Sequence, residues 1–366
     1  MADKRPDKIT IAEVAKLAGV STATAGRVLG GYGYSRQEIK DKVRQASEQL
    51  GYRPNLLARG LITGKTMTIG VVAGDIQSPF YASILRGVAD VARASGFGVL
   101  LTNSDERLDR ELEAVQLLRE KQVDGLIIAP SDILGSLHLH SAIRDGCPVV
   151  TIDRAVINLA ADSVTVDNRA ASRECISRLI DAGHRRIGMV AELERWEHGD
   201  VDAFIRSVER NAVDPTNLFP SWQRLFGYME AHRSAGLSVD RVLVGRVGVY
   251  SAEGARKETQ RLLHLPDRPT ALFTTDGLMS AAAMEVITTL DLRIPTDLSL
   301  ICFDDLDWMS FLKPGISAVV QPLIDMGEAA ARLILARING EDGEPQRVAL
   351  KPAFAERGSI APPRSL

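Results

Sequence analysis

The feature that most constrains the fold is a series of short β-branched runs that begins at residue 67. Such runs, alternating with helical stretches, are typical of βαβ units whose parallel strands are covered by helices on both faces. The runs fall into two series, which predict two doubly wound lobes. A ligand cleft is expected at the carboxyl ends of the strands. The first contains MTIGVVA, FGVLLTN, DGLIIAP, PVVTID, SVTVDN and RRIGMV, and the second contains PTALFTT, DLSLICFDD and GISAVV.

The N-terminal part has a different pattern, because apolar residues recur there at helical spacing. Two short helices are expected over residues 10–18 and 22–29, separated by a tight turn that contains Gly19. A third helix is expected after the capping-box pattern of Ser35 and Glu38. Three short helices with a tight turn between the first two indicate a helix-turn-helix, although a plain three-helix bundle also fits the periodicity.

The net charge of −3 combines two parts of opposite sign. Residues 1–66 contain 12 Lys and Arg against 6 Asp and Glu, whereas the remaining residues contain 32 against 41. A small basic part joined to a larger acidic one fits a nucleic-acid-binding module, and it also fits an ordinary solvated surface.

Several classes of protein are disfavoured. No apolar run approaches the roughly 18 residues of a membrane span, and the first ten residues are polar, so we expect a cytoplasmic protein without membrane contact. Cys147, Cys175 and Cys302 are far apart and odd in number, which predicts buried thiols and neither a disulfide framework nor a metal site. We find no catalytic motif such as G-x-S-x-G, H-E-x-x-H or G-x-G-x-x-G, and we expect no enzyme and no cofactor.

The residues themselves carry a resemblance that periodicity alone cannot give. IAEVAKLAGVSTATAGRVL, followed by YRPNLLARGLITGKTMTIGVV, closely resembles the headpiece and hinge of the lac repressor family (LacI/GalR). The resemblance implies a helix-turn-helix headpiece over residues 1–53, a hinge helix and linker over 54–66, and a two-lobed effector-binding and dimerisation domain over 67–366. The fold implied is an all-α headpiece plus a periplasmic-binding-protein-like α/β sensor with parallel doubly wound sheets.

The resemblance also implies roles for the second helix. Thr22, Ala23 and Arg27 correspond to base-reading residues, and Thr24 corresponds to a phosphate contact. Arg27 can reach a guanine edge with two hydrogen bonds. Gly26 stands where the family usually has serine, which puts the operator sequence in doubt.

In the family, the segment after the headpiece becomes helical on DNA and inserts leucines from two subunits into the minor groove. Asn55, Ala58 and Leu61 occupy the corresponding positions, and Leu61 is the candidate wedge. The resemblance therefore implies a homodimer on a near-palindromic double-stranded DNA operator.

Candidate effector-binding residues are expected at the ends of strands, because resemblance to sugar-binding members points there. Aromatic rings can stack on a sugar ring, and charged and amide groups can bond neighbouring hydroxyls. Thr275 stands where sugar binders commonly have asparagine. The candidates are Ser78, Phe80, Tyr81, Asp153, Arg154, Asn168, Arg224, Thr275, Asp304 and Gln321.

The stretch 191–221 is about twenty residues longer than the resemblance predicts. Trp196 in it could stack on a ligand, or the stretch could be a helical insertion packed by Trp196 and Phe204. We leave both interpretations open.

Together these observations predict a sequence-specific transcription regulator, acting as a repressor, whose operator affinity is controlled by a sugar or polyol. Two alternatives remain open. One is the same regulator with a sugar phosphate or nucleoside as effector. The other is a sugar-binding protein without a DNA function, which would have no use for residues 1–66.

Overall fold

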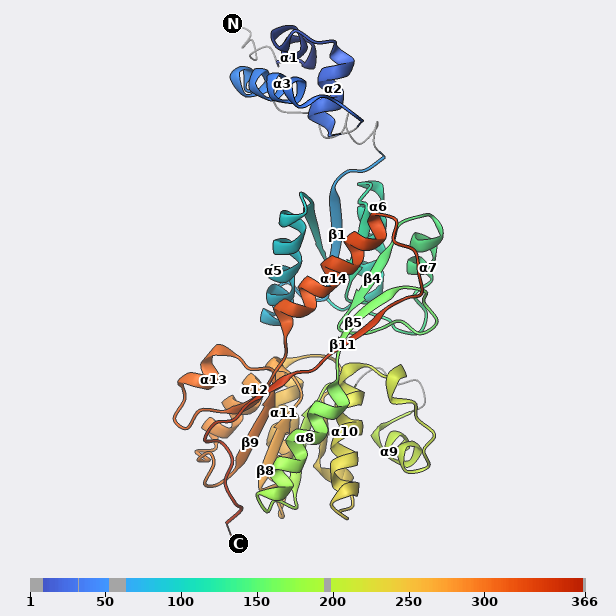
Figure 1. The fold of residues 1–366 in the computed structure, drawn as a ribbon. Helices are drawn as coiled ribbons and strands as arrows, with labels where there is room; N and C mark the ends of the chain where they lie inside the picture. Colours follow the sequence, from blue (N-terminus) through green and yellow to red (C-terminus); the bar gives the residue numbers. More distant parts are fainter. Residues whose placement is uncertain (1–8, 32, 53–63, 194–198, 365–366) are drawn as a thin grey trace, which may run out of the picture.

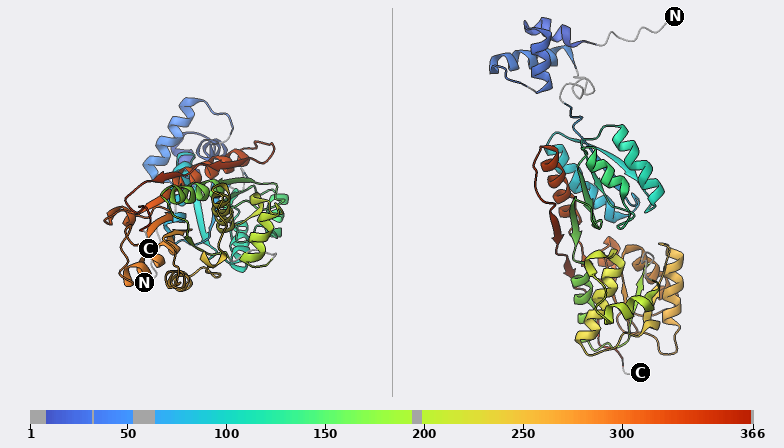
Figure 2. Two further views of the ribbon diagram at one scale, coloured as in Figure 1. Left: turned by 90° about the horizontal axis from the view of Figure 1, so that it is seen from below. Right: turned by 90° about the vertical axis from the view of Figure 1, so that its right-hand side faces the viewer.

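The computed structural model describes residues 9–31, 33–52, 64–193 and 199–364. It shows a small helical headpiece and two α/β lobes (Figures 1 and 2). This arrangement confirms the predicted fold class.

The headpiece contains three helices around a small apolar core. The helices are α1 (Ile11–Ala18), α2 (Thr22–Gly30) and α3 (Gln37–Leu50). Ser21 caps α2 by accepting a hydrogen bond from the backbone N–H of Thr24 at 3.1 Å. The capping box expected at Ser35 is wrong, because α3 starts two residues later, after Arg36, without a side-chain cap. The buried residues of the core are Val14, Ala15, Ala25, Val43 and Ala46.

Lobe 1 is a six-stranded parallel sheet in the order β11-β5-β4-β3-β1-β2. Its strands are β1 (Thr68–Ala73), β2 (Gly98–Asn103), β3 (Gly125–Ile128), β4 (Val149–Ile152), β5 (Asp162–Val166) and β11 (Arg347–Leu350). Its helices are α5 (Pro79–Ala94), α6 (Leu108–Glu120), α7 (Leu137–Arg144) and α14 (Leu323–Ile338).

Lobe 2 repeats this plan in the order β12-β10-β9-β8-β6-β7, with only the β10–β12 pair antiparallel. Its strands are β6 (Ile187–Ala191), β7 (Val244–Arg246), β8 (Ala271–Thr274), β9 (Ser299–Phe303), β10 (Ser317–Val320) and β12 (Ala353–Ala355). Its helices are α8 (Asn168–Asp181), α9 (Val201–Glu209), α10 (Pro220–Ser234), α11 (Ala252–Leu263), α12 (Gly277–Thr289) and α13 (Asp307–Phe311), with 3-10 turns η1 (Pro215–Asn217) and η2 (Arg241–Leu243).

The chain crosses between the lobes three times: after β5, after β10 and after β11 (Figure 1). After the first crossing, α8 packs closely on α10 in lobe 2. After the second crossing, α14 packs closely on α5 in lobe 1. Glycines permit both contacts. A Cβ at Gly327 would collide with the carbonyl oxygen of Ile84, and one at Gly227 would collide with that of Arg169.

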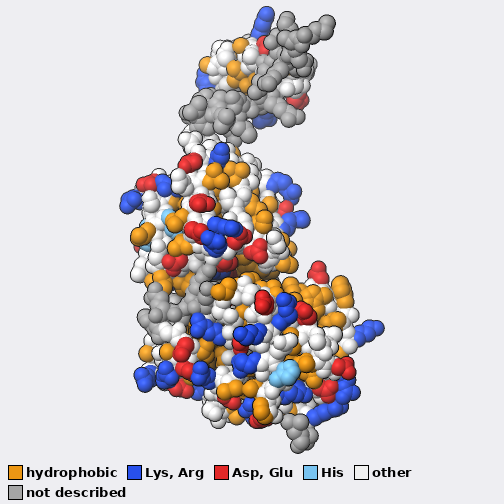
Figure 3. Space-filling view, turned by 180° about the vertical axis from the view of Figure 1, so that it is seen from behind, with side chains coloured by type: hydrophobic (Ala, Val, Ile, Leu, Met, Phe, Trp, Pro, Cys, Tyr) orange, Lys and Arg blue, Asp and Glu red, His pale blue; other side chains and the backbone are white. Residues whose placement is uncertain are grey.

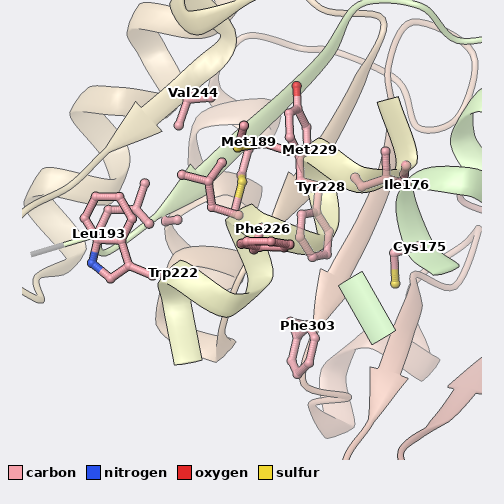
Figure 4. Packing of buried hydrophobic residues seen from close by; sticks show 14 of the residues in the cluster. Cys175, Ile176, Met189, Leu193, Trp222, Phe226, Tyr228, Met229, Val244 and Phe303 are labelled. Carbon is pink, nitrogen blue, oxygen red and sulfur yellow. The ribbon is translucent and has the colours of Figure 1, made fainter. Parts of the chain in front are cut away.

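The long stretch after β6 forms α9 and η1 in lobe 2, within its described part. Phe204 of α9 is fully buried, and its ring lies 4.7 Å from that of Trp222 in α10. Trp222 lies beside Leu193 in the core of this lobe (Figure 4). Phe204 therefore packs as the structural interpretation expected, whereas Trp196 lies outside the described residues.

The cysteines are free thiols. Cys175 and Cys302 are buried as expected, but Cys147 is only partly buried, which corrects that prediction. No described helix is long and apolar enough to cross a membrane.

Candidate functional site

The outer face of α2 carries the residues predicted to read DNA. Thr22, Ala23 and Arg27 are exposed, and Thr24 is half-buried with its hydroxyl 2.9 Å from that of Ser21. Within the described residues, the Arg27 guanidinium makes no ion pair. A cation without a protein partner on an exposed helix face suits contact with DNA.

The predicted hinge residues Asn55, Ala58 and Leu61 lie outside the described residues.

Arg154 is the centre of a polar cluster in lobe 1. Its Nη1 lies 2.8 Å from Oε2 of Glu106, and its Nη2 lies 3.1 Å from Oε1 of the same carboxylate. Its Nε donates to Oδ2 of Asp153 at 3.0 Å. The Tyr81 hydroxyl donates to Oε1 of Glu106 at 2.6 Å. Two carboxylates of its own lobe therefore neutralise Arg154.

Local geometry brings these groups together. A Cβ at Gly74, just after β1, would overlap the Glu106 carboxylate and lie 2.5 Å from the Tyr81 hydroxyl. Asp153 directly follows β4 in a left-handed conformation, with φ of 71°. The absent side chain at Gly74 thus makes room for the contact between Glu106 and Tyr81.

The contacts in this cluster shift the pKa values of Arg154 and Tyr81. Burial lowers the pKa of Arg154, but the charges of Glu106 and Asp153 outweigh that effect and hold it above its ordinary value. Burial and the charge of Glu106 together raise the pKa of Tyr81. The cluster therefore contains a charged guanidinium and a neutral phenol at neutral pH.

Arg224 organises the corresponding region of lobe 2 by different contacts. Its Nε donates to Oδ1 of Asn168 at 2.9 Å, its Nη1 donates to the carbonyl oxygen of Thr275, and its guanidinium lies 3.8 Å from the Phe303 ring centroid. Within the described residues Arg224 makes no ion pair closer than 4 Å. Its position is fixed by neutral groups and an aromatic face.

Asp304 and Asp276 supply negative charge in lobe 2. Asp304 follows β9 and accepts hydrogen bonds from Gln321 at 2.5 Å and from the backbone N–H of Gly277 at 3.1 Å. Asp276 caps α12 by accepting from the N–H of Met279 at 2.9 Å, and the Tyr250 hydroxyl lies 3.4 Å from the same oxygen.

Burial raises the pKa of both carboxyls. The pKa of Asp276 rises from 3.8 to about 6, chiefly through burial and further through the charge of Asp304. Burial also raises the pKa of Asp304, while the Arg224 charge partly opposes the shift. Raised carboxyl pKa values with a charged neighbour are common at functional sites.

The two clusters face each other across the lobe boundary. The Arg154 guanidinium of lobe 1 lies 5.6 Å from the Phe219 ring centroid of lobe 2. The charge of Asp153 acts on Asp304. Ile133, in a lobe 1 loop, is buried in the apolar core of lobe 2. Groups from the ends of strands in both lobes therefore form one polar region.

The remaining predicted residues take less central places. Ser78 precedes α5 without a side-chain cap, and Phe80 packs edge-on against Tyr81 with ring centroids 5.0 Å apart. The Thr275 hydroxyl donates to the Val190 carbonyl oxygen at 3.2 Å, so only its backbone oxygen meets Arg224. Gln321 reaches the region through Asp304.

Sequence reasoning missed Glu106, Phe219, Tyr250 and Asp276. Glu106 and Asp276 follow the ends of β2 and β8, so the criterion that selected Asp153 and Asp304 would also have found them. Tyr250 follows the end of β7 by four residues, so the same criterion could have found it, whereas Phe219 precedes α10 and no local sequence signal marks it.

Comparison with known proteins agrees with this geometry. The profile of bacterial regulatory proteins of the lacI family matches residues 10–55, and that of the periplasmic binding protein-like domain matches residues 176–360. Catabolite control protein A of Priestia megaterium is 32% identical over 334 residues, covering 91% of this chain and 93% of that protein. The chain belongs to the LacI family. It is therefore a DNA-binding transcription regulator.

Other LacI-family members match along nearly the whole chain. The repressor CytR of Escherichia coli K12 is 29% identical and covers 93% of each chain. A solved complex of the transcriptional regulator CelR with cellobiose is 28% identical, with a TM-score of 0.67 and coverage of 97% of this chain and 100% of that one. The lac repressor dimer bound to operator has a TM-score of 0.78 at 21% identity over 97% of this chain and 100% of that one, which supports the fold alone.

Proposed function

We propose that this protein is a cytoplasmic repressor whose homodimer binds a near-palindromic operator and whose operator affinity is controlled by a sugar or polyol. One observation carries the proposal. The chain joins an exposed Arg27, which makes no ion pair within the described residues, on a helix-turn-helix to polar groups that converge from two lobes. We assign residues 1–53 to the headpiece, 54–66 to the hinge and 67–366 to the sensor.

The DNA-reading roles come from the exposed face of α2 and from the family resemblance. We propose that Thr22, Ala23 and Arg27 read bases, that Thr24 contacts phosphate, and that the hinge residues Asn55, Ala58 and Leu61 act in the minor groove. Because one headpiece reads only a half-site, two copies are needed for a palindrome.

The exposed surface of lobe 1 supports pairing of two chains. Leu100 and Leu101 on the edge strand β2 are 40% and 45% exposed, and Leu112 and Leu117 on α6 are similarly exposed. Exposed leucines on an edge strand are an aggregation liability unless another surface covers them. On the face drawn in Figure 3, acidic and basic side chains are interspersed over both lobes, with hydrophobic side chains between them.

The proposed effector action follows from linkage. A ligand that contacts both lobes favours one lobe arrangement by its differential affinity for it, and that arrangement sets the spacing of the hinges in the dimer. The ten effector-binding candidates remain a proposal, with Arg154 and Asp304 as the bridging residues from lobes 1 and 2. The names of relatives support a sugar, since CelR was solved with cellobiose and another match is a ribose operon repressor.

The test begins with the full chain and random duplex DNA. Selection of bound duplexes gives an operator, and fluorescence anisotropy then measures affinity for operator and for scrambled DNA. We expect Arg27→Ala to lose about 1 to 3 kcal/mol of discrimination at one base pair per half-site. We expect Leu61→Ala to weaken operator binding while nonspecific binding stays largely intact. If both variants lose as much affinity for scrambled DNA as for operator, these roles are wrong.

Two further measurements complete the test. A thermal-shift screen of the full chain against sugars, polyols and nucleosides identifies the effector, since a ligand at a hundred times its Kd adds about 2.7 kcal/mol of stability. That ligand must then change operator affinity. Sedimentation of the operator complex with a single copy of the chain contradicts the dimer, and absence of any DNA binding would favour a sugar-binding protein without a DNA function.

A further inference from the structure

Three polar atoms in the region between the lobes have no hydrogen-bond partner among the described residues. They are Oδ1 of Asp153 in lobe 1, and Oδ2 of Asp276 and Nη2 of Arg224 in lobe 2. The other oxygen of each aspartate and the other two guanidinium nitrogens of Arg224 are occupied. These atoms therefore offer a ligand two unoccupied acceptors and one unoccupied donor, beside any second hydrogen bond that Arg154 or Asp304 can make.

The other cation of the region is already neutralised. Both terminal nitrogens of Arg154 bond to Glu106, and Nε bonds to Asp153. Only 11% of the Arg154 side chain is exposed, and 25% of that of Glu106. An anionic ligand that took over the paired donors of Arg154 would have to displace the half-buried carboxylate of Glu106.

From these contacts we infer that the effector is an uncharged, hydroxyl-bearing molecule and not its phosphate ester, and that Glu106 is the positioning residue that imposes this choice. The inference rests on the proposed function, because it concerns the effector site of that regulator. It selects between the sugar or polyol and the sugar phosphate that the sequence left open.

The chemistry of the free atoms carries this choice. A hydroxyl donates one hydrogen bond and accepts two, so neighbouring hydroxyls can donate to Asp153 and Asp276 and accept from Arg224. A phosphate dianion only accepts, and it would face the like charges of Asp153, Asp276 and Asp304. An anion-binding site would instead present arginines that are free for bidentate contact.

Glu106 has contacts that suit a positioning role. Its carboxylate accepts hydrogen bonds from both the Tyr81 hydroxyl and Arg154. The absence of a side chain at Gly74 leaves the space that this carboxylate occupies. The charge of Glu106 also reaches Tyr250 of lobe 2. Neutralising this side chain therefore changes the charge presented to a ligand, while its shape is kept.

The experiment compares neutral ligands with their phosphates on the full chain, without DNA. The pairs are ribose and ribose 5-phosphate, glucose and glucose 6-phosphate, cellobiose and cellobiose 6-phosphate, and uridine and uridine 5′-monophosphate. Thermal shift finds binding pairs and calorimetry gives both Kd values. We expect the neutral member to bind about a hundredfold more tightly, because unpaired and like charges oppose the phosphate. A phosphate ester that binds as tightly as its neutral partner overturns the inference.

The variant Glu106→Gln tests the assigned residue. It retains an acceptor for Tyr81 but removes the charge opposite Arg154, so we expect the neutral-to-phosphate affinity ratio to fall about tenfold or more. Glu113→Gln, on an exposed position of α6, is the matched control and should leave the ratio unchanged. An unchanged ratio in Glu106→Gln overturns the role of Glu106, because a merely structural residue would weaken both ligands equally.

Failure of this inference and failure of the proposed function give different results. The affinity ratio is measured without operator, whereas the proposed function requires the bound ligand to change operator affinity. A phosphate ester that binds tightly and controls the operator refutes the inference and keeps the function. A neutral sugar that binds without changing operator affinity keeps the inference and refutes the proposed function.

Discussion

The two lobes share a backbone plan but differ in how they treat charge. Strands β4 and β9 hold equivalent places in the two sheets, and each is followed directly by an aspartate, Asp153 or Asp304, with φ of 71°. In lobe 1 that aspartate is ion-paired with Arg154, which also binds Glu106. In lobe 2 it bonds to Gln321 and a backbone N–H, and the cation nearby lies on an aromatic ring.

This difference shows that repetition of a fold does not repeat its electrostatics. Lobe 1 balances its cation internally, so its polar groups are assembled before any ligand arrives. Lobe 2 leaves two carboxyls without an ion pair closer than 4 Å in the described chain, and burial raises the pKa of both. We expect lobe 1 to be sensitive to loss of a cation and lobe 2 to loss or gain of a proton.

The largest effect is expected when the internal balance of lobe 1 is broken. Arg154→Ala should lower the free energy of unfolding by about 3 to 5 kcal/mol, because it leaves the carboxylates of Glu106 and Asp153 without their cation. Urea unfolding measures the loss. Arg107→Ala is the control, since its pair with Asp109 is exposed and should change stability by less than about 1 kcal/mol. A small loss of unfolding free energy for Arg154→Ala would mean that the ion-paired cluster does not stabilise lobe 1.

The next effect concerns ligand binding by lobe 2. Asp304→Ala should reduce effector affinity by roughly ten- to several hundredfold, because a charged hydrogen bond is lost between the closed lobes. Operator binding without effector should change little. Calorimetry with the identified effector gives the affinity, and binding within about twofold of the parent would refute a ligand contact at Asp304.

The helix pairs provide a test in which the lobes should behave alike. Gly327→Ala in lobe 1 and Gly227→Ala in lobe 2 each place a methyl group against a backbone carbonyl of the facing helix. Each should lower the free energy of unfolding by about 1 to 3 kcal/mol, because the packed helices must separate. Gly96→Ala is unsuitable as a control, since Gly96 has φ of 75°. Ala235→Ser, beyond the end of α10, serves instead. Opposite outcomes in the two lobes would refute their equivalent packing.

The smallest effect concerns the proton on Asp276. The folded state raises this pKa from 3.8 to about 6, so the folded protein holds the proton more tightly than the unfolded chain does. The contribution of Asp276 to stability therefore falls as pH rises from about 4 to 6 and is constant above that range. Asp276→Asn keeps a good N-cap and removes this loss, so it should raise stability by about 1 to 2 kcal/mol above pH 6 and change it little near pH 4.

Melting curves between pH 4 and 8 measure this dependence. Asp325→Asn, on the exposed start of α14, is the control for the loss of a surface carboxylate. A gain in Asp276→Asn that is equal at pH 4 and pH 8 would show that burial does not raise this pKa.

The sequence predicted the architecture well because its signals are local. The headpiece helices and the βαβ units are set by apolar spacing within a few residues, and each predicted run formed a strand. RRIGMV, placed in the first series, forms β6 of lobe 2, and β7, β11 and β12 had no predicted run. The start of α3 was misplaced because Ser35 and Glu38 fit a capping pattern that the backbone does not use. The place of Phe204 was left open, because only its packing on Trp222 distinguishes a core residue from a surface one.

By itself, the sequence determined the fold, the family and which strand ends carry polar residues. Tertiary structure alone decided how those residues combine. Glu106 and Arg154 are 48 positions apart, and their pairing depends on two strand ends meeting beside the space at Gly74. The raised pKa of Asp276 likewise depends on burial next to Asp304. Periodicity is a property of neighbours in the chain, whereas charge balance is a property of neighbours in space, and only folding relates the two.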